Sequence, residues 1–150
     1  MFCKRGSEEE RMNDPMTTAK QVPYLFSEDA KAQAAFYVEA LGGQINSVLT
    51  YGQLPDANEA NKDKVIHLCV EAGGATLFMS DSFEPVHYGN GISLSLEFPS
   101  EDEARTAFAR LAEGGQVKHP LEPAFWGALF GQLEDKFGVQ WMITNAAKAN

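Results

Sequence analysis

His67 and Glu97 are the two residues of this 150-residue chain best suited to bind an ion or move a proton at the surface of a sheet. Each lies in a run in which apolar and polar residues alternate, which is typical of a strand with one buried face. The apolar residues are expected to pack on a helix; they are Ile66, Leu68 and Val70 in the first run, and Ile92, Leu94, Leu96 and Phe98 in the second. The opposite face then carries Val65, His67, Cys69 and Glu71 in the first run, and Ser93, Ser95 and Glu97 in the second.

Each of these two candidates also has a simpler interpretation. His67 can serve as a hydrogen-bonded structural histidine, and Glu97 can be a solvated carboxylate near a strand end. Trp126, which follows Pro123 and precedes Gly127, either stacks on a ligand or closes the edge of a pocket. Cys69 is expected to be an inert thiol, because the sequence shows no cationic neighbour for it.

An internal repeat supplies the elements that must position these side chains. Phe26 and Phe98, Phe36 and Phe108, and the glycine pairs 42–43 and 114–115 are all 72 residues apart. Each copy is predicted to pass from a short strand into a helix, over 29–41 and 101–113, that stops at its glycine pair. The first helix is expected to bury Ala32, Ala35, Phe36 and residues 38–41, and the second to bury Ala104, Ala107, Phe108 and Leu111.

Three strand-like runs follow each helix. They are 44–52, 65–72 and 75–80 in the first copy, and 116–121, 127–133 and 139–144 in the second. In the last run, Trp141 and Ile143 are expected to be buried, which leaves Gln140, Met142 and Thr144 on the open face. The pattern predicts an α+β domain over 22–150, made of two tandem βαβββ modules at 22–81 and 91–146. The polar residues 1–21 are predicted to be a flexible tail.

The composition restricts the class of protein and its partners. With 44% hydrophobic residues and no apolar run near ~20 residues, a globular protein is expected and a membrane partner is not. Twelve Lys and Arg against 21 Asp and Glu leave a formal charge of −9 and no basic patch, so no nucleic-acid partner is expected. Two poorly matched cysteines and the lack of a secretory segment favour the cytoplasm.

Several motifs together resemble a known family. They are Phe36-Tyr37 followed by Leu41-Gly42-Gly43, the run 78–81 (FMSD), the run 125–127 (FWG), and the run 135–141 (DKFGVQW). In these motifs and in its two βαβββ modules the chain resembles the vicinal oxygen chelate superfamily of glyoxalases, extradiol dioxygenases and bleomycin-resistance proteins, and within it the PhnB-like branch. The resemblance implies a cupped, mixed or antiparallel sheet with helices on its convex side. It also implies a divalent metal held from the first and last strand of each module, and a homodimer.

The metal ligands that the resemblance implies have no counterpart here. The last-strand acids would fall on Phe78 and Met142, and the first-strand histidines near Val22 and Ser93. No cofactor is therefore predicted, and a divalent metal is disfavoured. The expected function is binding of a small organic ligand in a largely apolar cup, through His67, Phe78, Ser93, Ser95, Glu97, Trp126, Met142 and Thr144. The alternative is a glyoxalase- or dioxygenase-like metal enzyme that uses His67 and Glu97.

Overall fold

The computed structural model describes residues 18–146, so residues 1–17 of the predicted tail lie outside it. The first module contains β1 (Tyr24–Ser27), α2 (Ala30–Leu41), β2 (Gly43–Thr50), β3 (Val65–Ala72) and β4 (Ala75–Asp81), with short 3-10 turns at Tyr51–Gln53 and Glu59–Asn61 in the predicted loop. The second contains β5 (Leu94–Phe98), α3 (Glu101–Leu111), β6 (Gln116–Pro123), β7 (Leu129–Glu134) and β8 (Gln140–Asn145). Neither helix in this part of the chain has the length and apolar character needed to cross a membrane.

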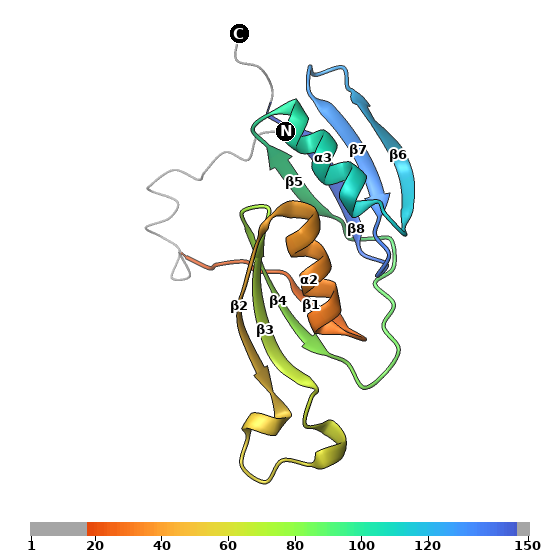
Figure 1. The fold of residues 1–150 in the computed structure, drawn as a ribbon. Coiled ribbons are helices and arrows are strands. Elements are labelled where there is room, and N and C mark those ends of the chain that lie inside the picture. Colours follow the sequence, from red (N-terminus) through yellow and green to blue (C-terminus); the bar gives the residue numbers. More distant parts are fainter. Residues whose placement is uncertain (1–17, 147–150) are drawn as a thin grey trace.

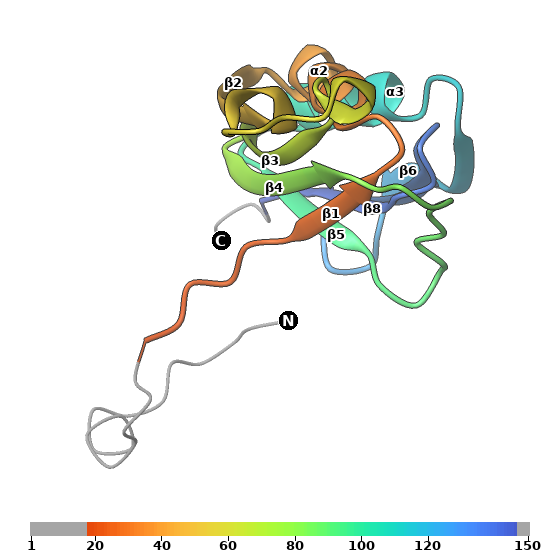
Figure 2. The same cartoon turned by 90° about the horizontal axis from the view of Figure 1, so that it is seen from below.

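Each module forms its own four-stranded mixed sheet, and the α+β class with two tandem βαβββ units is confirmed. The strand orders are β1-β4-β3-β2 and β5-β8-β7-β6 (Figure 1). In both sheets the first strand runs parallel to the last, and the other pairs are antiparallel. Both helices lie on the same side of the molecule, so each sheet has one covered face (Figure 2). We call the uncovered faces the first and second open face.

The helix faces agree with the sequence in the second module but not in the first. In α3 the buried residues are the predicted Ala104, Ala107, Phe108 and Leu111. In α2 the buried residues are Ala30, Gln33, Ala34, Tyr37 and Ala40, whereas Ala32 and Ala35 are exposed and Phe36 is half-buried. The predicted face of the first helix was therefore wrong, because Tyr37, rather than Phe36, enters the core.

The cause is a one-residue error in the repeat. Leu25 pairs with buried Met79 and Leu96 pairs with buried Ile143, which makes the offset of the first strands 71 residues. The same offset matches Tyr37 with Phe108 in the helices. The glycine pairs are 72 residues apart because the second module has one more residue, Glu113, between the helix and its glycines. A one-residue shift turns a helix by about 100° and reverses the face of a strand, so Phe26 and Phe98 are not equivalent.

A buried polar network joins the two modules. The Tyr37 hydroxyl donates a 2.6 Å hydrogen bond to Asp135, which is only 2% exposed and lies in the β7–β8 turn. Trp141 Nε1 and the backbone N–H groups of Phe137 and Val139 also donate to this carboxylate. On the other side of Tyr37, Gln33 Nε2 donates to its hydroxyl over 2.8 Å. All these groups have partners, so the network sets the orientation of α2 relative to the second sheet.

The network also controls the ionisation of two tyrosines. Burial raises the pKa of the Tyr37 hydroxyl far above its usual range, and the charge of Asp135 raises it further. Burial likewise raises the pKa of Tyr88, which lies in the linker between the modules and donates a hydrogen bond to the Phe26 carbonyl. Both hydroxyls are therefore neutral donors at ordinary pH.

Candidate functional site

The first open face carries a cluster of four rings: Tyr24, Phe26, His67 and Phe78. Register pairs Tyr24 with Phe78 across β1 and β4. The His67 ring lies 5.0 Å from that of Phe78 and 5.9 Å from that of Tyr24, measured between centroids. Phe26 is 58% exposed and Tyr24 is 42% exposed. An aromatic surface of this kind is costly to leave in contact with water and suits an apolar partner or ligand.

The second open face is polar at one edge and aromatic toward the other. Across the four strands, Glu97 on β5 pairs with Thr144 on β8, Thr144 pairs with Phe130 on β7, and Phe130 pairs with Glu122 on β6. A neighbouring row contains Ser95, Met142 and Gln132. The Trp126 ring lies 5.8 Å from that of Phe130 and is 49% exposed. We call Glu97, Thr144, Phe130 and Glu122, together with Trp126, the cross-sheet row.

Most predicted ligand residues reach an open face, but two residues near strand starts do not behave as expected. Ser93 is exposed and precedes β5, which begins at Leu94, and its neighbour Ile92 is 80% exposed rather than packed on the helix. Val65 is 1% exposed and lies in the core instead of on the open face. Its N–H donates to Asp81, and the β2–β3 register shifts next to it, which interrupts the alternation.

His67 and Glu97 lie on different sheets. No hydrogen bond or ion pair joins them in the described part of the chain, and the modules contact each other mainly through α2 and α3. Cys69 is half-buried and pairs with Phe78, with the Asn46 amide 4.0 Å from its sulfur. The hydroxyl of Thr144 donates to the Leu129 carbonyl, so this side chain is committed to the backbone. Within one chain, the predicted acid–base pair is therefore not assembled.

Equivalent positions of the two modules differ in chemistry. The strand registers match Tyr24 with Ser95, Phe26 with Glu97, and Phe78 with Met142. His67 and Phe130 are likewise matched, because each precedes the residue that pairs with Met79 or Ile143. One scaffold thus presents an aromatic face in the first module and a more polar face in the second.

The described residues fit a divalent metal poorly. Phe78 and Met142, at the last-strand positions, offer no hard oxygen ligand. Between residues 18 and 146, no three His, Cys, Asp or Glu side chains come together as a metal-ligating group. We therefore derive no chemical step through a metal.

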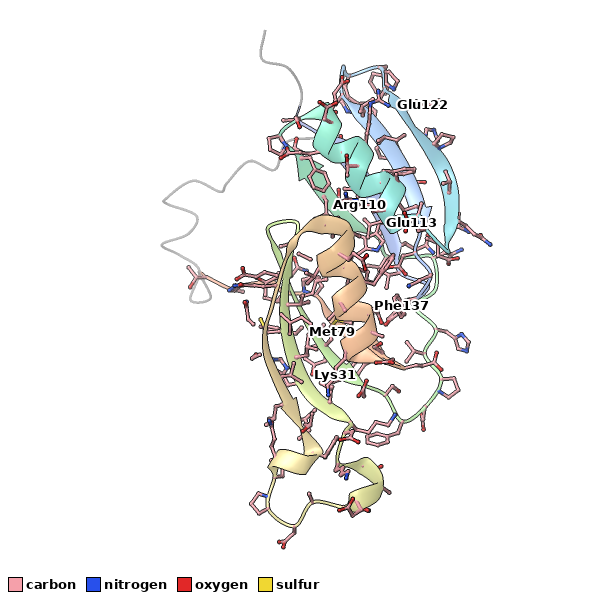
Figure 3. All side chains as sticks on the ribbon, in the orientation of Figure 1. Lys31, Met79, Arg110, Glu113, Glu122 and Phe137 are labelled. Atoms are coloured by element: carbon pink, nitrogen blue, oxygen red, sulfur yellow. The ribbon has the colours of Figure 1, made fainter. Side chains whose placement is uncertain are left out.

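A cleft of about 480 Å³ lies on the opposite side of the molecule, between α2, α3 and the β7–β8 turn. Its lining carries charges of both signs, from Glu39, Arg110, Glu113 and Lys136. Figure 3 labels Arg110 and Glu113 near the end of α3 that faces the first module. None of the residues predicted to bind a ligand lines this cleft.

Sequence reasoning missed Tyr24, Phe26, Phe130 and Glu122. The alternation of Tyr24 and Phe26 with Leu25 and Ser27 was visible, but the 72-residue offset matched Phe26 with the core-facing Phe98. Phe130 and Glu122 could not be paired from sequence, because the register between β6 and β7 shifts twice.

Comparisons with known proteins agree with this architecture. The family model described as "Glyoxalase/Bleomycin resistance protein/Dioxygenase superfamily" matches residues 18–143. The crystal structure of protein PA1353 from Pseudomonas aeruginosa is 36% identical, has a TM-score of 0.75, and covers 87% of this chain and 100% of its own. A PhnB protein from Bacillus cereus, a candidate 3-demethylubiquinone-9 3-methyltransferase, is 27% identical with a TM-score of 0.71, over 85% of this chain and 100% of its own. Protein YjdN of Escherichia coli is 27% identical over 134 residues, which are 81% of this chain and 91% of YjdN.

Proposed function

Because the chain belongs to the glyoxalase/bleomycin resistance protein/dioxygenase superfamily, we propose that it binds a small organic molecule on its open faces without the usual metal. The observation that carries this proposal is the exposed aromatic surface. Tyr24, Phe26 and Trp126 are between 42% and 58% exposed, and each contacts another ring on an open face. Contiguous apolar surface of this kind marks binding sites in globular proteins.

The methyltransferase name of the Bacillus cereus neighbour does not extend to this chain. A methyl-donor loop needs glycines before a helix, whereas both glycine pairs follow a helix here. The second glycine of each pair instead lies against strand backbone, where a Cβ at Gly43 or Gly115 would be about 2 Å from a carbonyl oxygen. Their role is packing.

We further propose that the protein works as a cytoplasmic homodimer. Each chain leaves one aromatic and one more polar face open, and a two-fold axis can bring the first open face of each copy onto the second open face of the other. His67 of one copy and Glu97 of the other would then line one cavity. The contact would also cover Phe125, which is 97% exposed beside Trp126.

The dimer is tested by sedimentation. We expect a mass of two chains at micromolar concentration, and expect Phe26→Ser to shift the equilibrium toward one chain because it removes exposed apolar area from the contact. Phe83→Ser is the matched control, since Phe83 is 59% exposed but lies in the linker, against Tyr51. A single-chain mass for the wild type at high micromolar concentration would contradict the dimer.

The absence of a metal requirement is tested by thermal unfolding with Ni²⁺ or Zn²⁺. We expect no saturable rise in melting temperature, because the open faces lack a set of hard ligands. A bound metal at a hundredfold excess over its Kd would stabilise the fold by about 2.7 kcal/mol, which such a measurement detects. If metal raises the melting temperature and His67→Ala abolishes the rise, His67 is a ligand. The metal-dependent enzyme using His67 and Glu97 then replaces the binding protein.

A further inference from the structure

We infer that the ligand of the second open face is an organic cation with an apolar body, its charge held by Glu97. This inference rests on the proposed function, because it specifies the chemistry of a ligand for the same surface. It is carried by the cross-sheet row, in which a free carboxylate and aromatic rings share one face.

Register places the groups of the row side by side. Glu97, Thr144 and Phe130 occupy successive strands, β5, β8 and β7. With strands roughly 4.8 Å apart, Glu97 lies about 10 Å from Phe130, which is the length of a small ligand. The Trp126 ring extends the aromatic part beyond Phe130, and the Met142 thioether lies in the next row. A ligand along the row would meet a carboxylate at one end and rings at the other.

The charges on this face are those that attract a cation. The strands β5, β7 and β8 contain no lysine or arginine, and β6 has one lysine, Lys118, at a register shift of that edge strand. Glu122, at the far end of the row near the tip of β6 (Figure 3), lies 3.7 Å from His119. Glu97 is exposed and has no hydrogen-bond or ion-pair partner among residues 18–146, so its carboxylate is available to a ligand.

Aromatic rings and a carboxylate together select an ammonium group over a neutral or anionic one. A cation gains from the ring faces and from the carboxylate, whereas an anion is repelled by Glu97 and by the overall charge of −9. The apolar body gains equally in all three cases, since it contacts Phe130, Trp126 and Met142.

Titration calorimetry with three probes of one shape tests the inference: 4-phenylbutylammonium, 4-phenylbutanol and 4-phenylbutyrate, at one ionic strength. We expect the ammonium compound to bind about tenfold more tightly than the alcohol, and the carboxylate compound to bind most weakly. Glu97→Gln should remove this preference while leaving the affinity for the alcohol unchanged. Trp126→Leu should weaken the ammonium compound and the alcohol alike.

Glu113→Gln is the matched control, because it removes the same charge from the helix side and should leave the preference intact. Equal affinities of the wild type for the ammonium compound and the alcohol would overturn the inference and leave the proposed function standing. Loss of the preference in Glu113→Gln would also overturn it, since the effect would then come from net charge. If none of the probes binds, both the inference and the proposed function fail.

Discussion

Asp135→Ala is expected to lower the free energy of unfolding by about 4 kcal/mol, measured by urea denaturation of the full chain. The carboxylate accepts four hydrogen bonds, from the side chains of Tyr37 and Trp141 and from two backbone N–H groups of its own turn. Its removal leaves these buried donors without partners, which costs more than the loss of the bonds themselves. Because Tyr37 belongs to the first module and Asp135 to the second, the variant also loosens the contact between the modules.

Tyr37→Phe separates the contact between the modules from the turn. This variant removes one donor and keeps the ring, so we expect a smaller loss of about 1.5 kcal/mol. Tyr51→Phe, outside the network and half-exposed, should change the stability little. If Asp135→Ala unfolds at the same urea concentration as the wild type, the network does not hold the modules together.

Gly115→Ala is expected to lower the free energy of unfolding by about 3 kcal/mol, again by urea denaturation. A Cβ at this residue would lie 2.1 Å from the Glu134 carbonyl oxygen and 2.8 Å from the Asp135 carbonyl carbon. Both are backbone atoms of the neighbouring β7 strand and its turn, so relief requires β6 to move away and lose hydrogen bonds. Gly43→Ala should cost at least as much, because its φ of +141° adds backbone strain to a 2.0 Å contact with the Glu71 oxygen.

Gly91→Ala is the control for these two variants. A Cβ added at Gly91 would have no neighbour within 4 Å, and the residue lies in the segment before β5, so a change below about 0.5 kcal/mol is expected. Equal effects of Gly91→Ala and Gly115→Ala would mean that chain flexibility, and not close approach of strands, explains the glycine pairs.

Local pattern was enough to predict the order of the elements. The alternation in 94–98 and 140–144 identified strands whose buried residues, such as Leu96 and Ile143, agree with the structure. The spacing in α3 predicted its buried face without error. These features are set by neighbours in the sequence, since the periods of 2 and 3.6 residues follow from backbone geometry alone.

The repeat shows where local pattern stops being enough. Identical residues suggested an offset of 72, but the packing follows 71 through the first strand and helix. The match of the glycines and of Phe36 with Phe108 outweighed the period in α2, because Tyr37 and Gln33 look polar in sequence. They are buried because Asp135, 98 residues after Tyr37, supplies a hydrogen-bond partner.

The residues of the site were predictable in type, and their grouping was not. Sequence alone determined that His67, Glu97, Met142 and Thr144 leave the core side of their strands, because alternation requires only the adjacent residues. Tertiary structure alone decided that His67 joins an aromatic cluster while Glu97 lies in a row with Phe130 and Glu122 on the other sheet. The physical reason is that strand register and the packing of the two modules depend on contacts between residues far apart in the chain, which no local period records.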